Sequence, residues 1–159
     1  MKNFAKVGTA LAFSFAAAMA ATAQPAPPSP EEQAASAIDL RQSAFKLMGY
    51  NMGPLGGMLR GNVPFDAAVA EANASHIASL GEMLPALFAN DTSSFDLETE
   101  ALDSIWGSMD AFNEKAEALV TAANAAAETA AGGNEGQTKA ALGRIGQACG
   151  SCHDDFRVD

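Results

Sequence analysis

Residues 38 to 59 form the first clear pattern of the chain, because apolar side chains recur there at steps of three or four. This spacing places them on one face of an α-helix. Ser29, Pro30 and Glu32 supply an N-cap, a favoured first helical residue and the acid of a capping box. We predict a long helix from Pro30, with a kink or early fraying at Pro54, which lacks a backbone N–H. Its predicted buried face comprises Ile38, Arg41, Phe45, Met48, Met52, Leu55 and Leu59.

A second helix is predicted after the turn from Gly61 to Pro64, with Asp66 as its N-cap. Pro85 is expected to end this helix, because a proline interrupts the backbone hydrogen bonds. Turn-forming residues then indicate a loop that reaches to about Phe95. The predicted apolar face comprises Val69, Ala72 or Asn73, Ile77, Leu80 and Leu84.

Two further helices complete the pattern. The third runs from about Leu102 until Gly132 and Gly133 stop it, and the fourth begins at Asn134 or Thr138. Such amphipathic helices with short connections predict an all-α fold, an antiparallel up-down-up-down four-helix bundle. The face of the third helix comprises Leu102, Ile105, Met109, Phe112, Ala116, Leu119 and Ala123. The face of the fourth comprises Leu142, Ile145, Cys149, Cys152 and Phe156.

The N-terminal residues have the three parts of a secretory signal peptide: Lys2 and Lys6, an apolar stretch from Val7 to Met19, and Ala21-Thr22-Ala23. The apolar stretch is shorter than the about 20 residues that span a bilayer, and a retained amphipathic anchor is the alternative. We predict residues 1–23 as a cleaved signal peptide, 24–29 as a disordered leader and 30–159 as the folded domain. The expected location is the bacterial periplasm, without a membrane anchor.

Acidic residues outnumber basic ones, and the formal net charge is −10. Cleavage of the signal peptide would remove two lysines and leave the protein still more acidic. Nucleic acid and anionic membrane surfaces are therefore not expected as partners. A basic redox partner is possible, although charge alone does not identify one. Alanine is abundant and aromatic residues make up only 7% of the chain, which further favours an all-α fold.

The run Cys149-Gly150-Ser151-Cys152-His153 contains both cysteines of the chain and matches the attachment signature of a c-type haem. Residues three and four apart share one face of a helix, so both thiols can form thioether bonds with one porphyrin while His153 reaches its iron. Attachment of this kind requires free thiols outside the cytoplasm, which agrees with the predicted export. We predict one haem c per chain, bound covalently through Cys149 and Cys152, with His153 as an iron ligand.

A redox-active cysteine pair, part of a zinc site, or chance could also produce this motif. A zinc site requires about four ligands, and His76 is the only other histidine of the chain. A thioredoxin-like pair would follow a β-strand, and the sequence predicts none nearby. Haem attachment is the hypothesis that best fits these residues.

The predicted topology also indicates which residues face the other side of the haem. The first and last helices of such a bundle are antiparallel, so His153 lies beside the early part of the first helix. The candidates there are Arg41, Phe45 and Met48, whereas Met58 lies at the far end. A methionine ligand would give a saturated, low-spin iron suited to electron transfer. A phenylalanine cannot ligate, and it would leave a five-coordinate iron open only to small ligands.

Two arginines are candidates for contacts with the haem. An arginine on an apolar face is not expected to lack an anion, so Arg41 is predicted to grip a haem propionate, with extension to solvent as the alternative. Arg157 follows His153 by one helical turn, and it is predicted to cover the proximal side of the haem or to lie on the surface. His76 is expected to be structural or exposed. Trp106 is expected to fill the core, with packing on the haem edge as the alternative.

The chain resembles the cytochromes c′ over nearly the whole of its mature length. The likeness covers the segment Arg41 to Gly53, the turn Gly61 to Asp66 and the pair Ile105-Trp106. It ends with the Cys-x-x-Cys-His motif near the C-terminus and with Arg157 after it. The position of the motif is specific, because most other c-type cytochromes carry it near the N-terminus.

This resemblance implies a five-coordinate, high-spin haem that binds nitric oxide and carbon monoxide, in a homodimer formed by the first two helices. It also implies that His153 is the proximal ligand, that Phe45 occupies the distal position and that Arg157 lies beside the proximal pocket. Leucine is commoner than phenylalanine at the distal position of this family. Phe45 is therefore expected to affect how tightly the haem binds gases and which gas it prefers.

We predict that the protein binds small gases in the periplasm, with nitric oxide binding or protection as its role and without enzymatic activity. An electron-transfer cytochrome with Met48 as sixth iron ligand is the second hypothesis. A peroxidase is the third, but the first helix offers no distal histidine or acid to transfer a proton.

Overall fold

The computed structural model describes residues 26–158, whose regular structure is helical apart from one isolated bridge between Ala101 and Arg157. The predicted signal peptide, residues 1–23, lies outside the described residues, as do residues 24 and 25 of the leader, so this division of the chain stays a prediction. Within residues 26–158, no helix is long and apolar enough to cross a membrane. The helices are α1 (Pro30–Leu59), α2 (Ala67–Leu87), α3 (Ser104–Gly107), α4 (Met109–Ala131) and α5 (Glu135–Phe156).

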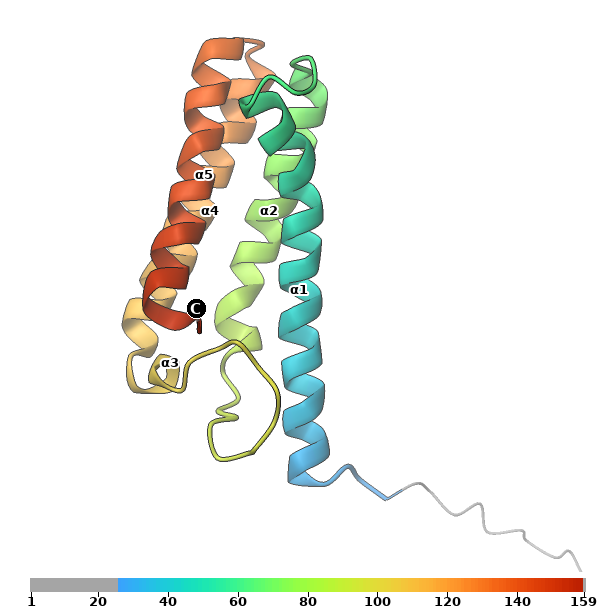
Figure 1. Cartoon of the computed structure of the whole chain (residues 1–159), viewed down its shortest axis with the longest axis vertical. Coiled ribbons are helices and arrows are strands. Elements are labelled where there is room, and N and C mark those ends of the chain that lie inside the picture. Colours follow the sequence, from blue (N-terminus) through green and yellow to red (C-terminus); the bar gives the residue numbers. More distant parts are fainter. Residues whose placement is uncertain (1–25, 159) are drawn as a thin grey trace, which may run out of the picture.

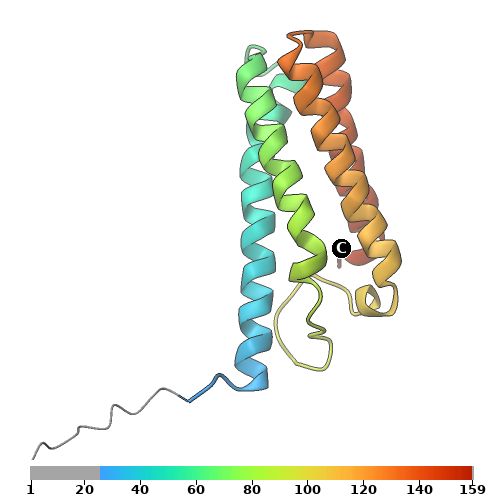
Figure 2. The same ribbon diagram turned by 180° about the vertical axis from the view of Figure 1, so that it is seen from behind.

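The long helices α1, α2, α4 and α5 run alternately up and down, as Figure 1 and the view from behind in Figure 2 show. α2 packs against both α1 and α4, and α4 packs against α5. α1 and α5 touch each other much less than these pairs do. The predicted all-α, antiparallel four-helix bundle is confirmed.

Polar side chains cap α1, α2 and α5 where the sequence predicts the starts of these helices. At α1, the Ser29 hydroxyl accepts from Glu32 N at 3.2 Å, and Ser29 N donates to the Glu32 carboxylate at 2.6 Å, which completes the capping box. The Asp66 side chain caps α2 by accepting from Val69 N at 3.0 Å. Asn134, and not Thr138, begins α5, since its side chain accepts from Gln137 N at 3.0 Å. Each cap satisfies a backbone N–H that the helix leaves free.

The two prolines inside helices interrupt them less than the sequence suggests. α1 passes Pro54 and continues to Leu59, so the expected early fraying is not seen. In Figure 1 its last turns lean toward the opposite pair of helices, and residues 55–58 are all buried there. α2 likewise passes Pro85 and ends at Leu87, so the predicted end at Pro85 is wrong. The exposed Pro85 costs one backbone hydrogen bond, whereas the buried residues Leu84 and Phe88 hold the last turn in place.

The predicted third helix is divided into α3 and α4 at Ser108, whose backbone dihedrals, φ −141° and ψ 39°, are not helical. Trp106 precedes this break, and its indole N–H donates to the Phe88 carbonyl at 3.0 Å. The hydrophobic pattern nevertheless continues across the break, because Ile105 and Phe112 are both buried. Periodicity therefore predicts the buried face correctly but not the change of backbone direction.

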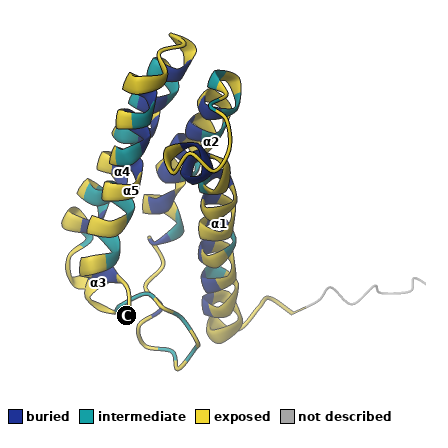
Figure 3. Cartoon of the chain, turned by 45° about the horizontal axis from the view of Figure 1, so that its top comes forward, coloured by how far each residue is buried: buried dark blue, intermediate teal, exposed yellow. Residues whose placement is uncertain are grey.

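Buried residues gather between the α1–α2 and α4–α5 pairs, and exposed residues cover the outer sides of the helices (Figure 3). On α2, Ile77 and Leu84 of the predicted face are buried together with the small residues Ala70, Ala74 and Ala78, whereas Ala72 of the predicted face is exposed. Small side chains allow α2 to approach α4 closely. A methyl group at Gly81 would lie only 2.9 Å from Val120 Cγ2.

Candidate haem-attachment site

Cys149, Cys152 and His153 lie on the last turns of α5, near the marked C-terminus in Figure 1. All three side chains are partly buried, and the two cysteines are free thiols that pack against the buried core. Their spacing of three and four residues brings them to one face of the helix. A planar group lying against this face could bond to both thiols and to the imidazole.

The structure argues against a redox-active cysteine pair and against a zinc site. Burial raises the pKa of both the Cys149 and the Cys152 thiol, whereas a redox-active thiol has a lowered pKa. The helix that carries the motif follows α4 and not a strand. Among residues 26–158, no group of three or more His, Cys, Asp or Glu side chains could hold a metal ion. A zinc site would therefore lack its ligands.

The imidazole of His153 is in the right protonation state to bind iron. Burial lowers its pKa, and the positive charge of Arg157 lowers it further, although Asp154 and Glu100 oppose the shift. His153 is therefore neutral at neutral pH, and the neutral ring is the form that ligates metals. Two free thiols and a neutral imidazole on one helix face fit haem c. Cys149 and Cys152 would carry the thioether bonds, and His153 would ligate the iron.

A short bridge with the segment before α3 fixes the end of α5. Leu102 N donates to the Phe156 carbonyl at 3.0 Å, and Val158 N donates to the Glu100 carbonyl at 2.9 Å. This bridge begins three residues after His153, so it restrains the turn that presents the imidazole. The sequence gives no sign of the bridge, because the two segments are more than 50 residues apart.

Arg157 lies beside His153, with 3.5 Å between its Nη1 atom and the imidazole Nδ1. The Arg157 side chain is exposed, and the contact is at the upper limit for a hydrogen bond. The structure thus brings together the two residues that the sequence places one helical turn apart. Whether Arg157 covers a bound haem stays a prediction.

Arg41 is buried, with only 3% of its surface exposed, so the alternative of extension to solvent is wrong. Its Nε donates to the Leu87 carbonyl at 2.9 Å and its Nη1 to the Thr92 hydroxyl at 2.8 Å, while its Nη2 donates to the Asn90 carbonyl. Burial lowers the pKa of Arg41, and Asp91 opposes this shift. These neutral oxygen acceptors therefore compensate the cost of burying the Arg41 charge. No bound anion is needed to explain why Arg41 is buried. A contact of Arg41 with a haem propionate stays a prediction.

Phe45 and Met48, the two distal candidates, differ in exposure. Phe45 is 40% exposed, whereas Met48 is 7% exposed and belongs to the buried core. A row of aromatic contacts joins Phe45 to Phe88 (6.3 Å between ring centres), Phe88 to Phe112 (4.6 Å) and Phe112 to Phe156 (5.6 Å). This row leads from α1 to the turn that follows His153. Phe45 and His153 therefore lie at the same end of the bundle, as the topology predicts.

Other residues near this end have mainly structural contacts. Trp106 is partly buried and donates to a backbone carbonyl, so it does more than fill the core. His76 is exposed, and its Nδ1 lies 3.0 Å from Asn51 Oδ1, which links α2 to α1. Sequence reasoning missed Lys115, which pairs with Asp155 at 2.8 Å. No local pattern could reveal this contact, because it joins two helices.

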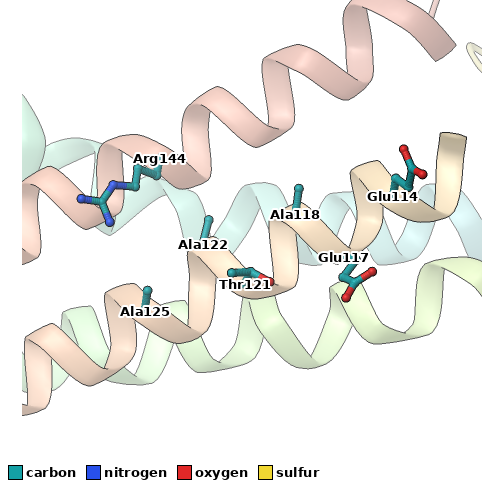
Figure 4. A pocket seen from close by; sticks show the side chains of 7 residues that line it. All are labelled: Glu114, Glu117, Ala118, Thr121, Ala122, Ala125 and Arg144. Carbon is teal, nitrogen blue, oxygen red and sulfur yellow. The ribbon is translucent and has the colours of Figure 1, made fainter.

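Two hollows of the surface lie away from the attachment residues. One, of about 450 Å³, lies along α4 and α5 between two glutamates at one end and Arg144 at the other (Figure 4). A second, of about 520 Å³, lies against the segment between Thr92 and Trp106 and against Val158. Neither hollow is lined by Cys149, Cys152 or His153. The chemistry of the attachment motif, and not the shape of the surface, identifies the candidate site.

Comparison with known proteins gives independent evidence. Residues 36–157 match the model of a protein family described as Cytochrome C′. The matched segment includes residues of every helix of the bundle and the whole attachment motif. A cytochrome c′ from Cereibacter sphaeroides is 42% identical over 123 residues, which are 76% of this chain and 82% of the relative.

Two solved structures share the fold. One is a cytochrome c′ with an unusual ligand-controlled dimer dissociation; it has a TM-score of 0.71 and 34% identity, over 84% of this chain and 100% of the other. The second is a nitric oxide complex of a mutant cytochrome c prime from Alcaligenes xylosoxidans. It has a TM-score of 0.70 and 28% identity, over 79% of this chain and 97% of the other.

Proposed function

Because the chain belongs to the cytochrome c′ family, we propose that it is a periplasmic haem protein with a five-coordinate, high-spin iron that binds nitric oxide and carbon monoxide. The covalent haem c of this family supplies an iron with one open position for such a gas. Cys149 and Cys152 anchor the haem, His153 is the proximal ligand and Phe45 closes the distal side. The role is nitric oxide binding or protection, and no enzymatic activity is assigned.

The difference in exposure between Phe45 and Met48 carries this proposal. The ring of Phe45 is accessible at the end of the bundle that carries His153, and a hydrocarbon ring cannot ligate iron. The thioether of Met48 is buried in the core, so Met48 would have to leave its packing to become a ligand. The nitric oxide complex of the relative from Alcaligenes xylosoxidans supports a site that is open to this gas.

Absorption spectra of the reduced holoprotein, with and without carbon monoxide, test the proposal. A five-coordinate iron gives broad high-spin bands that shift when carbon monoxide is added. Sharp, split low-spin bands that ignore carbon monoxide would instead indicate an electron-transfer cytochrome. In that case Met48→Ala identifies the ligand, because it converts the low-spin spectrum to high spin.

The proposed assembly is a homodimer formed by α1 and α2. Large apolar side chains lie exposed on these helices: Leu40 (55%), Leu47 (53%), Tyr50 (78%) and Met83 (52%). An exposed apolar face of this kind is typical of a contact between proteins. The similar cytochrome c′ with ligand-controlled dimer dissociation supports a second copy as the partner. Sedimentation at micromolar concentration should show a dimer for the wild type and a monomer for Leu47→Glu, and a monomeric wild type would reject the assembly.

The proposed export depends on residues 1–23 and is tested on the full chain expressed in a bacterium that attaches haem c. The mature protein should begin at Gln24, and haem should be found in the periplasmic fraction. A protein of full length in the membrane fraction would support the retained anchor instead.

A further inference from the structure

Lys115 of α4 contacts the attachment segment of α5 at three points. Its Nζ atom donates to the Ser151 hydroxyl at 2.6 Å and to the Ser151 carbonyl at 3.2 Å, and it lies 2.8 Å from Asp155 Oδ2. Ser151 stands between the two cysteines, and Asp155 lies two residues beyond His153. Lys115 therefore ties α4 to the segment on both sides of Cys152 and His153.

Lys115 also affects the balance of charge at this end of α5. The C-terminal end of a helix carries a partial negative charge, and Asp154 and Asp155 add to it. Arg157, the C-cap residue of α5, brings one positive charge to this end of the helix. Lys115, from the neighbouring helix, brings a positive charge beside the attachment segment. Figure 1 shows α4 and α5 side by side along this stretch.

We propose that Lys115 is a positioning residue for the haem-attachment segment. It holds the last turns of α5 against α4, and its charge favours the reduced iron. The second effect follows because the reduced iron carries one more electron than the oxidised iron, and a nearby cation stabilises it. This inference rests on covalent haem attachment at Cys149 and Cys152, and it does not depend on which gas the protein binds.

The experiment compares three variants of the holoprotein, Lys115→Gln, Lys115→Arg and Lys139→Gln. Lys139 is a matched control, because it forms an ion pair of 2.7 Å with Glu135 at the other end of α5. The two lysine side chains are also similarly exposed, at 30% for Lys115 and 33% for Lys139. The measurements are the midpoint potential of the haem, amide hydrogen exchange of residues 152–157, and covalent haem content by pyridine haemochrome.

Lys115→Gln should lower the midpoint potential, and more so at low than at high ionic strength, because salt screens the lost charge. Exchange of the amides of residues 152–157 should become about two- to fivefold faster, as expected for the loss of an exposed ion pair with its hydrogen bonds. Lys115→Arg should retain the wild-type potential and protection, and Lys139→Gln should change neither.

A Lys115→Gln variant that matches Lys139→Gln in both potential and exchange would overturn this inference. The two proposals fail in different ways. A wild-type protein without covalent haem would overturn the proposed function as well. A wild-type protein with covalent haem and an unaffected Lys115→Gln variant would overturn only the role of Lys115.

Discussion

The guanidinium carbon of Arg41 lies 4.6 Å from the centre of the Phe88 ring, so a cation from α1 stacks on an aromatic side chain at the end of α2. The same guanidinium lies 5.3 Å from the ring of Trp106 and donates to three acceptors in residues 87–92. One buried side chain therefore organises the loop at the end of the bundle where His153 lies. Its acceptors are carbonyl and hydroxyl oxygens and not carboxylates.

Arg41→Met should lower the free energy of unfolding of the holoprotein by roughly 3 kcal/mol, because it leaves buried acceptors without donors while it removes the cost of burying the charge. Arg41→Lys should lower the free energy of unfolding by less, since the lysine ammonium can still donate to some of the three acceptors. Urea unfolding followed by circular dichroism measures both values. A loss below about 1 kcal/mol for Arg41→Met would show that the loop does not depend on these bonds.

The close contact between α2 and α4 predicts that Gly81→Ala destabilises the protein. A methyl group at position 81 would meet Val120 Cγ2 at 2.9 Å. The clash should cost about 2 kcal/mol, the middle of the usual range for overpacking, whereas replacing glycine with alanine in a helix gains roughly 1 kcal/mol. Thermal unfolding should therefore show a net loss of about 1 kcal/mol.

Gly143→Ala is the control for this prediction, because nothing lies within 4 Å of a methyl group at that helical position. This variant should gain up to about 1 kcal/mol from helix propensity alone. Adding Val120→Ala to Gly81→Ala should remove most of the clash and restore most of the stability that the clash costs. An equal gain in stability for Gly81→Ala and Gly143→Ala would mean that α4 can shift away from α2 without an energetic cost.

The parts of the fold that the sequence predicts correctly depend on neighbours in the chain. The start of α1 follows from the Ser29–Glu32 capping box, whose members are three residues apart. The attachment residues follow from a spacing of three and four on one helix. In both cases local geometry decides the outcome before the rest of the protein packs around it.

The errors arise where contacts between distant segments decide the structure. α2 continues past Pro85 because Leu84 and Phe88 are buried on its other side. Arg41 is paired with a loop 46 to 51 residues further along the chain, and Lys115 with a residue 36 positions away. Neither periodicity nor local spacing encodes such pairs, so the sequence predicts the residues of the site but not the contacts that hold them.

The capping box of α1 predicts a dependence of stability on pH. Hydrogen bonds from Ser29 lower the pKa of Glu32 below its ordinary value of 4.5. A carboxylate with a lowered pKa in the folded state stabilises the protein above its ordinary pKa, and this contribution is lost as the pH falls through the lowered value. Glu32→Gln, which removes the charge, should therefore be less stable than the wild type at neutral pH, and the difference should shrink in acid.

Denaturant unfolding of the wild type and Glu32→Gln between pH 7 and pH 3 measures this change. Glu31→Gln serves as a control, because Glu31 lies in the same helical turn and is not part of the capping box. A difference between wild type and Glu32→Gln that stays constant over this range would show that the cap does not depend on the charge of Glu32.

Phe45→Leu should speed the binding of carbon monoxide to the reduced holoprotein. The ring of Phe45 is held on one side by Phe88, at 6.3 Å between ring centres, so it cannot swing freely from the place it occupies. A smaller, more flexible leucine should lower the steric barrier to the entering gas. A barrier lower by about 1.4 kcal/mol makes association tenfold faster, and stopped-flow mixing measures a change of this size.

Phe65→Leu is the control, because it makes the same change of side chain at a partly buried residue that precedes α2, at the opposite end of the bundle. It should leave the association rate unchanged. Since Phe45 is 40% exposed, Phe45→Leu should cost little stability, and a faster rate could not be attributed to partial unfolding. An unchanged rate for Phe45→Leu would mean that the ring does not border the open position of the iron, and the distal side would then have to be sought elsewhere on α1.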